Sequence, residues 1–465
     1  MRSQRTKPRQ EGASPDTPLP RACRCVFLWY HAKMKFSGAD AAPADRAGIE
    51  DNDRLCDEEW KRGLVNVSSV PRLLTIETTS ICNLRCVMCG HGAHPKDQSY
   101  QHFPESLTPR LRGVIRLASH VQLHGLGEPL MNPAFWKMLD LTHENQHVQI
   151  NSNGQLLDKG KVDRILTTNL SEISFSLDAA TAETYRKIRD ADFGRVVENL
   201  RYLIAERRRL GRTSPHVSMN MTLMRENIEE TVRFVELAHE LKADQVQFGH
   251  LNRLEGGQGW RVEREGWIFD YCEQMLVNDP ALSNRMIAAA RDRAQELGIE
   301  LYLDWAKQVF YDDGEEPSCR MPDTPRPSAD CGSGSSPATG HHQPSPKDCN
   351  SPWNWMLIRT NGDVHACCFG TGRLGTICDF DPLEIWNGQT TVALRHRLLA
   401  DDIHPVCSYG VCKFVNGRPC REDRALWSRG RLVKFLKSSP LRSVVGETVW
   451  GLLRKFRDGT RSQRP

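Results

Sequence analysis

The sequence has no long hydrophobic run. Its most apolar stretch near the start, "CVFLWY" at residues 25–30, is far shorter than the roughly 20 residues that cross a bilayer. Its flanks do not make a secretory signal. We therefore expect a cytoplasmic protein. The net charge of +4 is small for 465 residues, so the balance of charge does not indicate a nucleic-acid partner.

The sequence also lacks the regular spread of cysteines that is typical of a disulfide framework. The chain has sixteen, clustered at 82–89 and 349–420. In a reducing compartment, clustered cysteines indicate metal ligands. With 39% hydrophobic residues the chain has enough apolar side chains for a buried core.

Composition divides the chain into five parts. Residues 1–60 are rich in Pro, Arg, Ala and Asp without periodicity, so we expect a disordered N-terminal extension. Residues 320–348 form a flexible linker rich in Pro, Ser and Gly. A barrel domain at 70–310 precedes this linker, a cysteine-rich domain at 349–422 follows it, and 424–465 form a basic amphipathic tail.

Between the extension and the linker, short apolar runs alternate with longer helix-like stretches. The six runs are "LLTIETT", "HVQLHG", "HVQINS", "EISFSLD", "HVSMNMTL" and "DQVQFGHL". Such strand-then-helix units predict a parallel α/β sheet. Six units are fewer than the eight of a closed barrel, so we predict a partial (β/α)6 TIM-like barrel with its reactive groups at the carboxyl ends of the strands.

One loop at such a strand end, "SICNLRCVMCGHG", places Cys82, Cys86 and Cys89 at the spacing C-x3-C-x2-C. A [4Fe-4S] cluster held by four cysteines is coordinatively full, whereas one held by three leaves an iron free for another ligand. The alternative is a zinc site. Zinc sites usually pair C-x2-C units, so a three-cysteine loop fits zinc poorly.

The three-cysteine loop after the first strand resembles that of the radical S-adenosylmethionine (SAM) enzymes. The resemblance implies that Cys82, Cys86 and Cys89 bind a [4Fe-4S] cluster, whose free iron chelates SAM. It also implies reductive cleavage of SAM to a 5'-deoxyadenosyl radical, which removes a hydrogen atom from the substrate. Met88 departs from the family, which usually has an aromatic residue at this position.

Further motifs strengthen the resemblance. "HGLGEPLMNP" resembles the family's GGEP segment, which implies contacts with the SAM amino group from Gly125, Gly127, Glu128 and Pro129. Near strands three and four, the residues that the resemblance assigns to the SAM ribose and carboxylate are Asn151, Ser174, Ser176 and Asp178. The alternative for them is a polar turn that satisfies backbone groups. Arg189 corresponds to a recurrent family arginine, or it lies on a solvated helix face.

The region after the linker reads as a β-hairpin turning at Asn361-Gly362, with cysteines on both sides. Its "PW" and "EIW" landmarks resemble the SPASM or twitch extension of some radical SAM enzymes, which implies an auxiliary [4Fe-4S] cluster. We assign its ligands to Cys349, Cys367, Cys407 and Cys412. Cys368 and Cys420 are alternative ligands, and a zinc ribbon is the alternative site.

These motifs predict carbon–hydrogen chemistry on a small polar molecule, which we expect to be a sugar or aminocyclitol, as in natural-product biosynthesis. The enzyme would be an oxidoreductase or an epimerase, and Cys272 is the proposed hydrogen-atom donor for epimerisation. The alternatives are a ribosomal peptide maturase and a non-catalytic iron–sulfur or zinc protein. Because residues 1–60 show no compact leader-binding pattern, the sequence favours the small molecule.

We expect a reducing partner such as flavodoxin or ferredoxin. Residues 424–465 carry eleven Lys or Arg against two acids. Their amphipathic pattern is compatible with peripheral contact to an anionic membrane, and a terminal helix packed on the barrel is the alternative.

Overall fold

The structure is a computed structural model. It describes residues 43–90, 100–251, 260–303, 345–368, 372–407, 412 and 414. The predictions for residues 1–42, for 320–344 of the linker and for the tail at 424–465 lie outside the described residues.

The main sheet has ten strands in the order β12-β11-β10-β1-β2-β3-β4-β5-β6-β9. The first six strands of the chain lie side by side and parallel, which confirms the predicted partial barrel. The strands of this sheet are β1 (Leu73–Ile76), β2 (His120–Gln122), β3 (His147–Ser152), β4 (Glu172–Ser176), β5 (His216–Leu223), β6 (Gln245–His250), β9 (Glu300–Leu303), β10 (Trp355–Ile358), β11 (Asp363–His365) and β12 (Gly375–Thr376).

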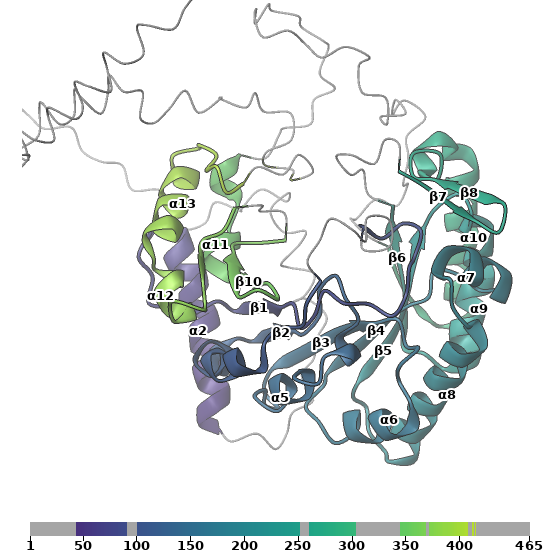
Figure 1. The fold of residues 1–465 in the computed structure, drawn as a ribbon, viewed down its shortest axis with the longest axis horizontal. Coiled ribbons are helices and arrows are strands. Elements are labelled where there is room, and N and C mark those ends of the chain that lie inside the picture. The colour runs from purple at the N-terminus through teal and green to yellow at the C-terminus, as the bar shows by residue number, and fades with distance from the viewer. Residues whose placement is uncertain are drawn as a thin grey trace, which may run out of the picture. The chain divides into compact units, whose positions relative to one another are not determined.

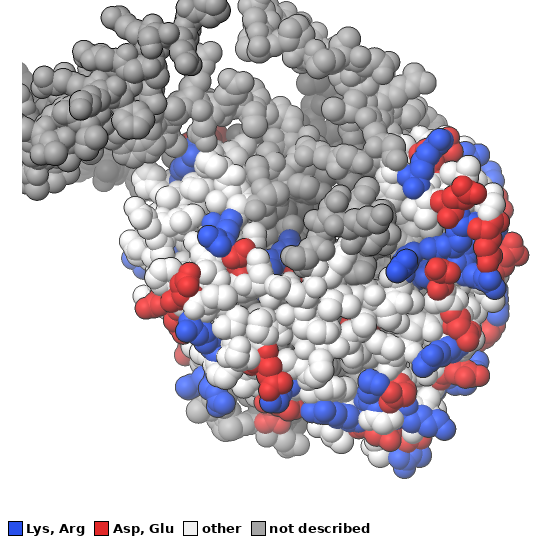
Figure 2. Space-filling view, in the orientation of Figure 1, with Lys and Arg blue, Asp and Glu red and all other residues white. Residues whose placement is uncertain are grey.

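Helices follow the strands and cover one side of the sheet, as Figure 1 shows for α6, α8 and α9 beside β3 to β6. Acidic and basic side chains are interleaved over the part of the surface formed by α7, α9 and α10 (Figure 2). The helices of the described residues are α2 (Pro43–Lys61), α4 (Arg112–Leu117), α5 (Phe135–Leu139), α6 (Lys159–Ile165), α7 (Ala182–Arg189), α8 (Phe193–Arg209), α9 (Thr231–Leu241), α10 (Pro280–Leu297), α11 (Ser351–Asn354), α12 (Pro382–Trp386) and α13 (Gln389–Leu399).

The two faces of the sheet differ in polarity because side chains alternate along each strand. The helix-covered face carries apolar residues such as Ile150, Phe175 and Met219, all fully buried. The opposite face carries the polar partners in register, beginning with Gln149 opposite Glu172. The sheet thus has an apolar side that forms the core and a polar inner side.

Helix α2 corrects the prediction that residues 1–60 are disordered. Asn52 joins this helix to the chain before β1: its amide donates to the Val70 carbonyl at 3.1 Å and accepts from the Val70 N–H at 2.9 Å. Ser119 donates to Asp53 at 3.0 Å. The charged composition of this segment did not indicate a helix, because the helix is stabilised by packing against residues that are distant in sequence.

The predicted hairpin at Asn361-Gly362 is confirmed by antiparallel pairing of β10 with β11, and Gly362 adopts the left-handed φ of 84° that such a turn needs. Strand β10 also pairs in parallel with β1, so the cysteine-rich region extends the barrel sheet. The indoles of Trp353 and Trp386 donate to the Leu64 and Ser69 carbonyls at 2.7 and 2.9 Å. The two regions are therefore joined by strand pairing and by side-chain hydrogen bonds.

Two strands that we did not predict, β7 (Arg261–Arg264) and β8 (Trp267–Asp270), form a separate antiparallel hairpin after β6. Cys272 follows this hairpin in a turn. None of the helices in the described ranges combines the length and apolar character needed to cross a bilayer.

Candidate active site

The loop after β1 carries Cys82, Cys86 and Cys89 as free cysteines. Burial raises the pKa of Cys82, and it raises the pKa of Cys86 to about 12. The Cys89 sulfur adds to the rise at both thiols, and the Cys82 sulfur adds to the rise at Cys86. Three sulfurs in one partly buried loop suit a cationic group, because iron supplies the positive charge that stabilises buried thiolates.

The surroundings of Cys82 fit a cluster ligand. Its sulfur accepts the Leu84 N–H at 3.5 Å and the Asn153 amide at 3.8 Å. Hydrogen bonds to sulfur are among the features that tune iron–sulfur clusters. Within the described ranges, no three His, Cys, Asp or Glu side chains converge as ligands of one metal ion. A cluster does not need that convergence, because each cysteine binds a different iron.

The glycines of "GLGEP" permit close approach to the cysteine loop. The Gly127 and Glu128 N–H groups donate to the Thr79 and Ile81 carbonyls, both at 3.0 Å. A Cβ on Gly127 would lie 2.5 Å from the Thr79 oxygen and 2.4 Å from the Ile81 oxygen. Only glycine fits against this backbone, so the motif fastens the two loops together.

Gly125 makes room for Glu77, which the sequence analysis missed. A Cβ on Gly125 would lie 2.3 Å from Glu77 Cγ. The Glu77 carboxylate accepts the Leu126 N–H at 3.0 Å and lies 3.7 Å from Arg359, which follows β10. Glu77 thus contacts both the "GLGEP" loop and the cysteine-rich region. Its position directly after the first strand, where functional groups were expected, could have indicated Glu77 from the sequence.

Glu128 is 2% exposed, and burial raises its pKa. Its carboxylate accepts hydrogen bonds from the Ser152 hydroxyl and the Asn153 N–H, both at 2.8 Å. The side chain therefore joins the "GLGEP" loop to the end of β3. Pro129 is buried and begins the short turn that follows. The predicted contacts of Glu128 and Pro129 with SAM stay predictions.

Asn151 and Ser174 lie opposite each other on β3 and β4, and Ser176 lies opposite Asn220 on β5. The structure thus brings these predicted residues together on the inner side of the sheet. Asn151 Oδ1, Ser174 Oγ and Asn220 Oδ1 are buried without a hydrogen-bond partner. Buried polar atoms without partners are costly unless a ligand satisfies them, so this region fits a polar cofactor.

Asp178, whose predicted role at the SAM ribose or carboxylate stays a prediction, is engaged within the protein. Its side chain is 1% exposed, accepts the Thr222 N–H at 2.6 Å and forms an ion pair with Arg189. Each carboxylate oxygen thus has a partner within the protein, and Asp178 orients Arg189. Arg189 is likewise buried rather than on a solvated helix face, and its guanidinium is among the groups that act on the pKa of Cys86.

A chain of polar side chains crosses the inner side at the level of Thr75. The Trp355 indole donates to Thr75 at 2.9 Å, and Thr75 donates to Gln122 at 2.8 Å. Gln149 continues the chain by accepting from Gln122 and donating to Glu172, both at 3.3 Å. This chain, which the sequence analysis missed, runs from the cysteine-rich region to β4.

The structure describes all four proposed auxiliary ligands, and none of them forms a disulfide: Cys349, Cys367, Cys407 and Cys412. Burial raises the pKa of Cys349 to about 12, with further contributions from Cys367 and Cys412. Burial also raises the pKa of Cys407, and the other three sulfurs add to the rise. The four sulfurs therefore share one neighbourhood. Cys368, exposed beside Cys367, stays an alternative ligand, and Cys420 lies outside the described residues.

Cys272 corrects another prediction. It is disulfide-bonded in the structure. A disulfide sulfur carries no S–H hydrogen, so Cys272 in this state cannot serve as the hydrogen-atom donor we predicted.

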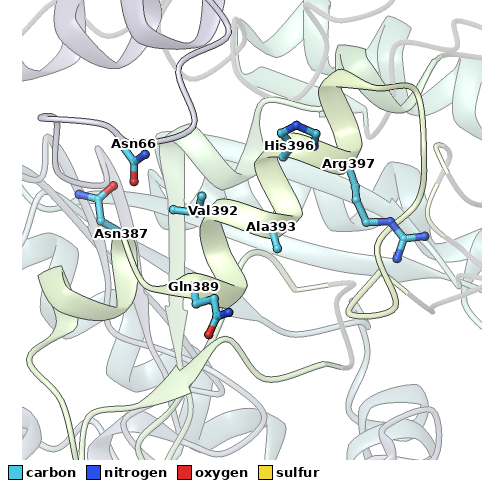
Figure 3. Close-up of a pocket in the computed structure, with 7 residues that line it drawn as sticks. All are labelled: Asn66, Asn387, Gln389, Val392, Ala393, His396 and Arg397. Carbon is cyan, nitrogen blue, oxygen red and sulfur yellow. The ribbon is translucent and has the colours of Figure 1, made fainter. Parts of the chain in front are cut away.

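A surface pocket lies between α13 and the segment at Asn66 (Figure 3). Its lining residues are Asn66, Asn387, Gln389, Val392, Ala393, His396 and Arg397. None of the predicted site residues is among them, so the pocket is not part of the site described above.

The fold and the site define an iron–sulfur protein with a partial α/β barrel, a three-cysteine loop after its first strand and a second group of cysteines near its C-terminal hairpin. Residues 76–238 match the family model of the radical SAM superfamily, and residues 349–413 match the SPASM iron–sulfur cluster-binding domain. The chain belongs to the radical SAM superfamily and carries a SPASM domain, as its motifs predicted. Its cofactors are accordingly SAM, the [4Fe-4S] cluster that binds SAM, and auxiliary iron–sulfur cluster content in the SPASM domain.

Among curated relatives, the chain is 29% identical over 241 residues to the mycofactocin maturase MftC of Mycobacterium tuberculosis, covering 48% of this chain and 57% of the relative. It is 25% identical over 183 residues to the AdoMet-dependent heme synthase of Methanosarcina barkeri, covering 39% and 50%. The chain thus spans about half the length of the curated relatives it matches. In fold it is similar to SuiB of Streptococcus suis, solved with precursor peptide SuiA, with TM-score 0.50, 14% identity and coverage of 79% and 76%.

Proposed function

We propose that this radical SAM enzyme is a maturase that modifies a peptide. The observation that carries the proposal is the similarity to the mycofactocin maturase, which extends over 48% of this chain. A peptide substrate replaces the sugar or aminocyclitol that we favoured from the sequence. The lack of a leader-binding pattern in residues 1–60 does not exclude a peptide substrate, because these residues are only one part of the chain.

The polar inner side of the sheet supports a peptide substrate. Beyond the residues proposed for SAM, it presents amide side chains such as Asn220 and Gln247, which lie opposite each other on β5 and β6. Amide groups both donate and accept hydrogen bonds, as a peptide main chain requires of its partner. Trp355 adds an aromatic side chain from the SPASM region, held by its hydrogen bond to Thr75. The substrate would therefore contact residues of both regions.

We infer that the reaction is an oxidation rather than an epimerisation. The disulfide at Cys272 removes the thiol that we had assigned to return a hydrogen atom. Four thiolates at the auxiliary site would leave it coordinatively full and suited to electron transfer. When bound, the clusters would supply the electron that cleaves SAM and accept the one that an oxidised substrate releases. A flavodoxin or ferredoxin is the proposed external donor.

Within the chain, we assign the cluster ligands to Cys82, Cys86 and Cys89, and the auxiliary ligands to Cys349, Cys367, Cys407 and Cys412. Gly125 and Gly127 allow the "GLGEP" loop to pack beside the first group. Asn151, Ser174 and Ser176 would hold SAM by their unpartnered or inward-facing polar atoms. Asp178 holds Arg189 in place by the ion pair between them.

Substrate-dependent formation of 5'-deoxyadenosine tests the substrate class. Reduced, reconstituted enzyme with SAM would be supplied with peptides encoded by short reading frames beside its own gene, and separately with a panel of sugars and aminocyclitols. We expect one peptide to raise 5'-deoxyadenosine formation and to lose the mass of two hydrogens. Stimulation by a sugar or aminocyclitol, with no peptide active, would overturn the peptide proposal.

A further inference from the structure

We propose that Trp260 and Arg264 are positioning residues for the SAM-binding cluster, because they hold the backbone of the cysteine loop from outside. The inference rests on the proposed ligands Cys82, Cys86 and Cys89. It does not depend on the identity of the substrate.

The two side chains bind carbonyls that lie between the cysteines. The Trp260 indole donates to the Val87 carbonyl at 3.1 Å, and the Arg264 guanidinium donates to the Arg85 carbonyl at 2.6 Å. Arg85 directly precedes Cys86, and Val87 directly follows it. Trp260 is 7% exposed, and the Arg264 side chain is 12% exposed. These donors are therefore largely shielded from water.

The same guanidinium reaches a second element. Its other terminal nitrogen donates to the Lys187 carbonyl at 2.6 Å, in the last turn of α7. The next carbonyl, that of Ile188, accepts the Val87 N–H at 2.9 Å. The last carbonyls of a helix have no partner within the helix. Arg264 and the loop backbone satisfy two of them, so the loop is held between α7 and the β7–β8 hairpin.

Two physical effects follow for a cluster bound by this loop. First, the loop cannot shift without breaking these hydrogen bonds, of which the one from Trp260 is buried and the one from Arg264 is charge-assisted, so its cysteines stay placed for the iron. Second, the positive guanidinium bound to the Arg85 carbonyl, one residue before Cys86, favours the reduced cluster, which carries one more negative charge. Trp260 contributes only the first effect, whereas Arg264 contributes both.

The variants Trp260→Phe, Arg264→Lys and Arg264→Gln separate these effects in the full-length reconstituted protein. Trp260→Phe keeps the ring and removes the N–H. Arg264→Lys keeps the charge and loses the planar fork that spans two carbonyls. Arg261→Gln is the matched control, since Arg261 lies on the same strand and pairs with Asp270 at 2.8 Å, exposed to solvent. Circular dichroism spectra check that each variant folds.

The readouts are the rate at which a chelator removes iron and the midpoint potential of the cluster whose electron paramagnetic resonance spectrum changes on adding SAM. We expect all three site variants to lose about four irons, those of one cluster, faster than wild type. The rate should rise about tenfold, because this is the change that the loss of one such hydrogen bond corresponds to. Only Arg264→Gln should also shift the potential to more negative values. Arg261→Gln should match wild type in both.

Wild-type rates of iron loss in both Trp260→Phe and Arg264→Gln would overturn the proposal. An unchanged potential in Arg264→Gln would remove the electrostatic part. If Cys82→Ala/Cys86→Ala/Cys89→Ala kept its full iron content, the ligand assignment itself would be wrong. A non-peptide substrate would alter none of these readouts, so failure of the proposed function is separable from failure of this inference.

Discussion

The guanidinium of Arg189, from α7, is buried against the carboxylate of Asp178, just after β4. Burial works against the charge on Arg189, but the nearby groups that can carry negative charge, Asp178 foremost among them, together outweigh burial and raise the pKa of the arginine. A buried ion pair whose one partner is removed leaves an uncompensated charge. Loss of either partner should therefore destabilise the fold.

Replacing Arg189 with Gln should lower the free energy of unfolding by about 3–5 kcal/mol. The cause is the unpaired carboxylate of Asp178, so the double variant Arg189→Gln/Asp178→Asn should recover part of the loss. Arg186→Gln serves as the control, because Arg186 pairs with Glu265 on the surface and should cost less than about 1 kcal/mol. Urea denaturation measures all three. Equal losses in the control and in Arg189→Gln would contradict this account.

Gly127→Ala should impair the cysteine loop. The added methyl group would lie within 2.5 Å of the backbone oxygens of Thr79 and Ile81, so the loop must move. We expect reconstituted protein to contain less iron and to bind SAM more weakly. Gly113→Ala is the matched control: a Cβ there meets nothing within 4 Å, and alanine favours the helix in which it lies. If Gly127→Ala behaved like Gly113→Ala, the close approach would not matter.

Iron counts test the two groups of cysteines. Wild type should hold about eight irons per chain, and Cys82→Ala/Cys86→Ala/Cys89→Ala about four. Cys349→Ala/Cys407→Ala should likewise hold about four, from the SAM-binding cluster alone. Cys378→Ala is the control, since this cysteine is exposed and outside both groups. A wild-type count near four would leave room for only one cluster.

Asp53 should make stability depend on pH. Burial raises its pKa from 3.8 to about 6, although Arg72 acts in the opposite direction. Because the folded protein binds this proton more tightly than the unfolded chain, the contribution is complete below pH 3.8 and is lost as pH rises through about 6. The full change corresponds to about 3 kcal/mol.

Denaturation of wild type and Asp53→Asn between pH 4 and 7 measures this effect. The asparagine does not ionise, so the variant should gain stability relative to wild type as pH rises. Asp51→Asn is the control, because Asp51 lies in the same helix but is exposed. Parallel pH profiles for wild type and Asp53→Asn would show that this carboxyl does not titrate as its burial implies.

The sequence predicted the barrel strands well because each has an apolar face that packs under helices. It could not predict α2 or the pairing of β10 with β1, since both depend on contacts between distant parts of the chain. The surroundings of Asp178 could not be predicted for a similar reason: the backbone turns there at a φ of 62°, and the carboxylate meets Arg189 from the following helix. The cysteine motif needed no tertiary information, because its ligands lie within eight residues of one another.

The most direct test of the account is release of 5'-deoxyadenosine by the reduced, reconstituted protein supplied with SAM and its peptide substrate. We predict formation of this product by wild type and none by Cys82→Ala/Cys86→Ala/Cys89→Ala. Its absence from wild type with a full complement of iron, or equal formation by the triple variant, would contradict the assignment of these cysteines to SAM cleavage.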